Sequence, residues 1–214
     1  VGGAVGMEGA GLLAARGALR SGVGLVTWNM PPGVQRDLEF PEVMTHDASD
    51  GLDPRSGTLV VGPGLGTSAD GARLLEFALK SGRPLILDAD ALTLLAQMEL
   101  APPPESILTP HPGEAATLLE TTVQEIQGDR LAAARRLSDT YGATVALKGA
   151  GTVITSPDEP LCLVDIACPA LAVPGSGDVL AGLIAGLRSQ GLGASNAAQA
   201  GAWLHGRAGV TLGE

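Results

Sequence analysis

Aromatic side chains are nearly absent from this sequence, and basic side chains are few. Only 2% of its 214 residues are Phe, Trp or Tyr, whereas hydrophobic residues make up 45%. The core must therefore be aliphatic, built from Leu, Val, Ile and Ala. Because 13 basic residues face 23 acidic ones, the net charge is −10, and no run of Lys or Arg occurs. A nucleic-acid partner requires a basic surface, so we expect none.

Cysteines and long apolar runs are also scarce. The two cysteines, Cys162 and Cys168, lack the spacing of a zinc site, and we expect a reduced pair in the cytoplasm. No apolar stretch reaches the length of a membrane span, so no membrane partner is expected. No signal peptide is visible either. The chain begins at Val1 without a methionine, in what reads as the end of a strand, so we expect that residues are missing upstream.

Short apolar runs alternate with helical stretches along the whole chain. The runs are rich in branched aliphatic residues and bounded by turn residues, which is typical of buried strands. The expected strands are 24–28, 58–62, 84–88, 106–110 and 143–149, followed by a hairpin of 152–155 and 161–164. The expected helices are 8–20, 68–81, 89–98, 112–120, 128–141, 178–189 and 195–209. This alternation predicts one α/β domain over residues 1–214, with helices on both faces of a mainly parallel sheet.

Ligands bind such sheets at the carboxyl ends of the strands, and a glycine loop is expected at that edge. Gly175, Ser176 and Gly177 precede an apolar helix and have small side chains, so a ligand can reach their backbone. Their N–H groups, with those of the first helical turn, predict an anion pocket. Asp178 is either an N-terminal helix cap or the base that accepts a hydroxyl proton during phosphoryl transfer. Capping alone does not require glycines on both sides of Ser176.

Two loops follow strands at the same edge. His111 and Glu114 lie three residues apart, between a strand and a helix. Glu114 suits either the first turn of that helix or a magnesium site, with His111 then touching the substrate. Lys148 ends a buried strand beside Gly149 and Gly151. It is either a solvated strand end or a phosphate ligand.

Two other glycine-rich segments carry weaker signals. The stretch 62–68, "GPGLGTS", resembles a dinucleotide fingerprint only loosely and equally suits an ordinary strand-to-helix turn. Residues 2–27 contain a glycine turn and then an alanine-rich helix, whose small side chains allow close packing against the sheet or a flat ligand.

In this order, six motifs together resemble the NAD(P)H-hydrate dehydratases, the carbohydrate-kinase-like family of the ribokinase-like superfamily. The motifs are "GAGLLAARGALRSGVGLVT", "GPGLG", "LDADAL", "LTPHPGEAATLL", "LKGAGTVI" and "GSGDVLAGLIAGL". The resemblance covers nearly the whole chain and implies a three-layer α/β/α sandwich. "GSGD" alone would indicate only the wider superfamily.

The resemblance implies a repair reaction. Family members use ADP or ATP to phosphorylate the added hydroxyl of hydrated NADH or NADPH (NADHX or NADPHX), and phosphate then leaves to restore the dihydropyridine ring. The nicotinamide cofactor is the substrate, and no hydride moves. The resemblance also implies Mg²⁺ as cofactor, a homotetramer, a cytoplasmic location, and an epimerase domain or partner.

Roles carried over by matching position are also implied by the resemblance. Asp178 would be the catalytic base, and Gly175, Ser176 and Gly177 the anion hole. The hydrated dinucleotide would be contacted by Asp178, Ala10, Gly64 or Gly66, and His111. The AMP portion of the phosphate donor would be lined by Lys148, Gly149, Ala150, Gly151, Thr152 and Gly177. Glu114 resembles the superfamily acid linked to magnesium, although the motif here reads H-x-x-E rather than N-x-x-E.

The sequence departs from the family pattern in places. Cys168 stands where the family usually has Asn, and Pro174 stands where it has Gly, which removes one N–H donor from the expected anion hole. Both ends look short, because most of the first strand is absent and the usual final helix is missing after Glu214. Two alternatives remain: a small-molecule kinase of the same fold, such as a hydroxyethylthiazole kinase, and a non-catalytic nucleotide-binding homologue.

Overall fold

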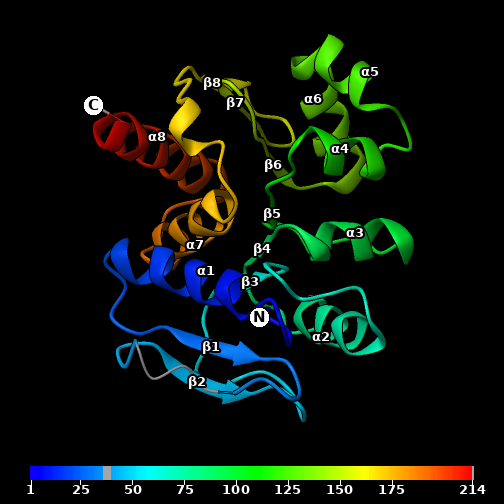
Figure 1. Cartoon of the computed structure of the whole chain (residues 1–214). Coiled ribbons are helices and arrows are strands. Elements are labelled where there is room, and N and C mark those ends of the chain that lie inside the picture. Colours follow the sequence, from blue (N-terminus) through cyan, green and yellow to red (C-terminus); the bar gives the residue numbers. More distant parts are fainter. Residues whose placement is uncertain (36–39, 214) are drawn as a thin grey trace.

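A six-stranded sheet runs through the middle of the computed structural model, which describes residues 1–35 and 40–213 (Figure 1). Glu214, at the chain end discussed above, lies outside the described residues. The sheet has the order β3 (Leu59–Val61), β4 (Leu85–Leu87), β5 (Ile107–Leu108), β6 (Thr144–Leu147), β7 (Thr152–Thr155) and β8 (Cys162–Val164). Strands β3 to β6 are parallel, whereas β7 and β8 are antiparallel and form the expected hairpin. The mainly parallel sheet is thus confirmed.

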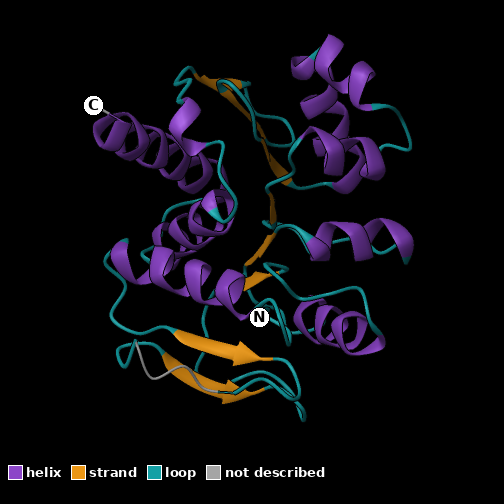
Figure 2. Ribbon diagram, in the orientation of Figure 1, coloured by secondary structure: helices purple, strands orange, loops and turns teal. Residues whose placement is uncertain are grey.

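Helices cover both faces of this sheet (Figure 2). One layer contains α2 (Ala69–Leu79), α3 (Asp90–Gln97), α4 (Pro112–Leu118), α5 (Val123–Gly128) and α6 (Arg130–Tyr141). The other contains α1 (Glu8–Arg20), α7 (Ser176–Ser189) and α8 (Ala194–Gly213). A short 3-10 helix, η1 (Pro169–Leu171), precedes α7. The strands alternate between two aliphatic cores, because Leu85 and Leu87 pack on the first layer and Ile86 on the second. The three-layer sandwich is therefore confirmed.

The first predicted strand is misplaced. The segment 24–28 was expected in the main sheet, but β1 (Thr27–Met30) pairs in parallel with β2 (Met44–Asp47) in a separate two-stranded sheet. Trp28, one of the few aromatic residues, is buried there, and its indole N–H donates to the carbonyl of Gly2 at 2.8 Å. This sheet lies below α1 in Figure 1.

Most other differences concern element boundaries. Helix α1 has the predicted bounds, whereas α7 begins at Ser176 rather than at residue 178. Helix α5 was not predicted, and β5 keeps only two of the five residues expected. Both cysteines are free. Among the described residues, no helix combines the length and the apolar character that a membrane crossing needs.

Candidate functional site

A cavity of about 640 Å³ lies beyond the carboxyl ends of the parallel strands. Its walls come from the residues that follow β4, β5 and β6, from the loop before α7, and from α8. The predicted site residues that line it are His111, Glu114, Lys148, Gly149, Ala150, Thr152, Gly175, Ser176, Gly177 and Asp178. Four loops far apart in the sequence thus contribute to one cavity, as parallel-sheet topology predicts.

The predicted substrate residues Ala10, Gly64 and Gly66 lie outside this lining, in a second group that also contains Asp90. A Cβ atom on Gly64 would lie 3.0 Å from that of Ala10, and the amide of Gly66 donates to the Asp90 carboxylate at 2.8 Å. Asp90 is near enough to Asp178 to raise the pKa of that carboxyl. Asp178 itself lines the cavity, and Asp90 links it electrostatically to this second group. Gly151 also lies outside the lining, next to Leu163.

The first turn of α7 is built without a side-chain cap. Gly175 is the N-cap residue, with a φ of +87°, and Asp178 is the third residue of the helix. No side chain of the described residues caps this end, and the N-cap is Gly175, so the interpretation of Asp178 as a helix cap is wrong. The Ser176 amide donates to Val173 O at 3.3 Å and is therefore not free. The amides of Gly177 and Asp178 have no acceptor in the described part of the chain and point outward at the positive end of the helix dipole.

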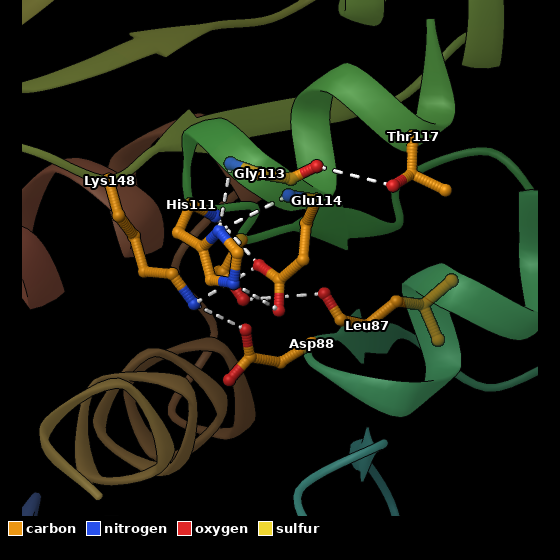
Figure 3. Close-up of polar contacts among 8 residues, drawn as sticks. Leu87, Asp88, His111, Gly113, Glu114, Thr117 and Lys148 are labelled. Atoms are coloured by element: carbon orange, nitrogen blue, oxygen red, sulfur yellow. Dashed lines mark hydrogen bonds and ion pairs between the residues drawn. The ribbon is translucent and has the colours of Figure 1, made fainter. Parts of the chain in front are cut away.

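Lys148 is not a solvated strand end. Its ammonium group lies 2.7 Å from Asp88 Oδ1 and 3.7 Å from Glu114 Oε2, with only 18% of the side chain exposed (Figure 3). A Cβ atom on Gly177 would lie 3.3 Å from Lys148 Nζ, so the ammonium group stands beside the first turn of α7. Burial lowers the pKa of Lys148, but the charges of Asp88 and Glu114 outweigh it and the net shift is upward. Lys148 is thus a paired, mostly buried cation beside open amides.

His111 and Glu114 cap helix α4 together. His111 Nδ1 accepts the amides of Gly113 and Glu114 at 2.9 and 3.2 Å, and Glu114 Oε2 accepts the His111 amide at 2.7 Å (Figure 3). Burial, with help from Asp88 and against Lys148, raises the pKa of Glu114. The helix-start interpretation of Glu114 is therefore confirmed, and the carboxylate also faces the cavity.

Among the carboxyl groups that line the cavity, Asp178 has a strongly raised pKa. Burial and the negative charge of Asp88 raise its pKa to about 6, against the opposing effect of Lys148. A carboxyl group that titrates near neutral pH is suited to accept a proton and release it again. Such a shift in a cavity also marks candidate functional residues in general.

Sequence reasoning missed two titratable residues that line this cavity, Asp88 and His205. Asp88, 1% exposed, follows β4 directly, and an acidic residue at the end of a predicted buried strand was a usable signal. His205 on α8 also lines the cavity, with Nε2 3.4 Å from Ser176 Oγ. Burial lowers the pKa of His205, which favours the neutral imidazole. No local pattern indicated His205, because α8 reaches the site only through the tertiary fold.

Comparisons with known proteins agree over the whole chain. Residues 1–214 match a family model described as NAD(P)H-hydrate dehydratase. The chain is 44% identical to the ADP-dependent (S)-NAD(P)H-hydrate dehydratase of Neisseria meningitidis, over 97% of this chain and 74% of that protein. It is 39% identical to the bifunctional NAD(P)H-hydrate repair enzyme Nnr of Escherichia coli, covering 99% of this chain but only 42% of that enzyme.

A solved structure is similar as well. The ADP/ATP-dependent NAD(P)H-hydrate dehydratase of Bacillus subtilis, co-crystallized with ATP/Mg²⁺, superposes with a TM-score of 0.83 and 30% identity. The match covers 97% of this chain and 77% of that one.

Proposed function

Because the chain belongs to the NAD(P)H-hydrate dehydratase family, we propose that it uses ADP or ATP to convert hydrated NADH or NADPH back to NADH or NADPH. The observation that carries this proposal is the joint placement of Asp178, Lys148 and the open amides of α7 at one cavity. A base, a cation and an anion pocket are the parts that phosphoryl transfer to a hydroxyl requires.

In the first step, Asp178 takes the proton of the added hydroxyl as that oxygen attacks the terminal phosphorus of the donor. The bond between that phosphorus and the bridging oxygen breaks, so ADP leaves as AMP, or ATP as ADP. Lys148 and the amides of Gly177 and Asp178 stabilise the charge on the moving phosphoryl group. The phosphorylated carbon then loses phosphate, and a ring proton is lost to restore the double bond.

The two ligands are assigned to different residues around Asp178. We place the AMP portion of the donor along Lys148–Thr152 and Gly177, most of which line the cavity. We place the hydrated dinucleotide against Ala10 and Gly64 or Gly66, outside the cavity lining, and against His111, which lines the cavity and lies where the two ligands meet. Asp178 lines the cavity, and Asp90, which accepts the Gly66 amide, adds to the rise in the pKa of Asp178. This supports the placement, because the transferred phosphoryl group must meet both ligands near Asp178.

Magnesium fits the donor set only as an ion carried by the nucleotide. No group of three or more His, Cys, Asp or Glu side chains capable of holding a metal occurs among residues 1–35 and 40–213. Magnesium usually keeps its waters and is held by one or two carboxylates and the substrate phosphates. Glu114 is the carboxylate that would face it. When bound, the ion would neutralise charge on the donor phosphates.

Further proposals concern a second repair activity, the oligomeric state and the cellular location. The bifunctional E. coli relative, of which this chain spans 42%, supports a second repair activity, such as an epimerase, beside this one. A homotetrameric assembly and a cytoplasmic location stay predictions from the family resemblance.

The test is direct. The protein is mixed with NADH hydrate, Mg²⁺ and either ADP or ATP, and the absorbance of regenerated NADH is followed. Absorbance should rise only when a nucleotide is present, with one phosphate released for each NADH formed. Phosphorylation of a thiazole alcohol in place of the hydrate would instead support the kinase alternative. Nucleotide binding without either reaction would support the non-catalytic alternative.

A further inference from the structure

Arg130 occupies a position that helix stability does not explain. It is the first residue of α6, where a positive charge opposes the helix dipole. The helix start is already capped, because the Asp129 carboxylate accepts the amide of Ala132 at 2.9 Å. No acidic side chain forms an ion pair with Arg130 in the described part of the chain, and its Nε atom is buried without a partner there. Some other contact must therefore account for its placement.

The guanidinium group instead binds the backbone of the loop between β6 and β7. Arg130 Nη1 donates to the carbonyl of Ala150 at 3.0 Å. Its Nη2 donates to the carbonyls of Leu147 at 3.1 Å and Gly151 at 2.6 Å. One planar fork thus joins the end of β6 to the far side of the loop.

The contact leaves no room for a side chain at Gly149. A Cβ atom on Gly149 would lie 2.6 Å from Arg130 Nη2 and 2.8 Å from its Cζ. The guanidinium group occupies the side of Gly149 where a Cβ atom would stand. Gly149 and the next residue, Ala150, nevertheless line the cavity on their remaining surface.

These contacts fix how the loop presents its amides. A trans peptide is planar, so its carbonyl and the following N–H point in opposite directions. Because the carbonyls of Ala150 and Gly151 face Arg130, the amides of Gly151 and Thr152 must face away from it. Without Arg130 the loop, which contains two glycines, could adopt other peptide orientations.

We infer that Arg130 is a positioning residue for the phosphate donor: it holds the Lys148–Thr152 loop in the conformation that accepts the nucleotide. This inference rests on the proposed function in assigning the nucleotide to that loop. Arg130 acts through the loop backbone, and its own charge is not the binding group. Preorganising a loop raises affinity because less order must be imposed on binding.

The test compares Arg130→Ala and Arg130→Lys with a matched variant, Arg135→Ala. Arg135 lies on the same helix and also donates to two backbone carbonyls, those of Ser156 and Glu159, but at the β7–β8 turn. Titration calorimetry with ADP and ATP measures nucleotide Kd without the hydrate, and dehydratase assays give donor KM and kcat. Circular dichroism identifies a temperature at which every variant is folded.

We expect Arg130→Ala and Arg130→Lys both to raise nucleotide Kd and donor KM by about tenfold, with a smaller change in kcat. Arg135→Ala should lose stability but keep the wild-type Kd. An unchanged Kd in Arg130→Ala overturns the inference, as does a wild-type Kd in Arg130→Lys, which would show that charge alone acts. An equal rise in Arg135→Ala also overturns it. If the wild type binds nucleotide but repairs no hydrate, the proposed function fails while the Kd comparison still decides the role of Arg130.

Discussion

The first turn of α7 and the middle of the same helix are both rich in glycine, but the space beside each differs. A Cβ atom on Gly177 would meet no atom nearer than Lys148 Nζ, at 3.3 Å, which is the movable end of a long side chain. A Cβ atom on Gly182 would lie 2.8 Å from the carbonyl carbon of Ala14 and 2.9 Å from the amide nitrogen of Ala18, both in the backbone of α1. Glycine therefore leaves the first turn open to the cavity and allows close helix packing in the middle.

This difference separates activity from stability along one helix. In an interior of packed helices, extra atoms cannot be absorbed without moving backbone. At the cavity, extra atoms on Gly177 would instead press on the Lys148 ammonium group and cover the amides of the first turn. Substitutions in the first turn should therefore change turnover, and substitutions in the middle should change the free energy of unfolding.

The largest effect is expected from Asp178→Asn. This variant keeps the side-chain shape but removes the base, so turnover should fall by about 10²–10⁴-fold, whereas nucleotide affinity changes little. Stability at pH 7 should not fall, because the raised pKa shows that the fold disfavours the charged carboxylate. NADH regeneration, nucleotide titration and thermal unfolding measure these three quantities. Wild-type turnover would remove Asp178 from its assigned role.

Gly182→Ala should give the largest loss of stability. The added methyl group would force α1 and α7 apart, so the free energy of unfolding should drop by at least about 2 kcal/mol, measured by urea denaturation. The matched control is Gly9→Ala on α1, where a Cβ atom would meet nothing within 4 Å. The control should leave stability unchanged or raise it by up to about 1 kcal/mol, because alanine favours helix. Equal effects in the two variants would contradict the packing argument.

Gly177→Ala should show the opposite pattern from Gly182→Ala. The methyl group would shift the Lys148 ammonium group by a few tenths of an ångström and shield the amides of the first turn. Turnover should therefore fall by about 10-fold to 100-fold, while the free energy of unfolding stays the same or rises slightly. A large loss of stability with wild-type turnover would break the distinction between the two parts of α7.

The fold was predictable because its signals are local. Alternation of apolar runs and helical patterns identified the main sheet, and the bounds of α1 were correct. Strand β2 was missed because its sequence, "MTHD", is short and half polar, so it has no apolar run to detect. Strand β1 was misassigned because the same pattern suits the main sheet and a separate pair of strands.

The site was predictable where its residues are contiguous in sequence, and not where residues distant in sequence come into contact through the fold. The glycine loop and Asp178 are contiguous, so their joint placement at the cavity could be predicted directly. The Lys148–Asp88 ion pair joins residues 60 positions apart, and it depends on β4 and β6 lying on either side of β5. The contact between Arg130 and the loop carbonyls depends likewise on where α6 begins.

The smallest expected effect concerns how kcat/KM and stability vary with pH, which tests the role of Asp178 in the first turn of α7. Asp178 must be unprotonated to accept a proton, and its pKa of about 6 places the acid limb of kcat/KM near pH 6, with a fall of about tenfold per pH unit below it.

The contribution of Asp178 to stability should change with pH in the opposite sense. A raised pKa adds stability below the ordinary value of 3.8, and this contribution is lost as pH rises through about 6. Wild type should therefore lose stability relative to Asp178→Asn over that interval, measured as the difference in Tm between them from pH 4 to pH 7. An acid limb near pH 4, or a constant Tm difference, would show that burial and Asp88 do not tune this carboxyl.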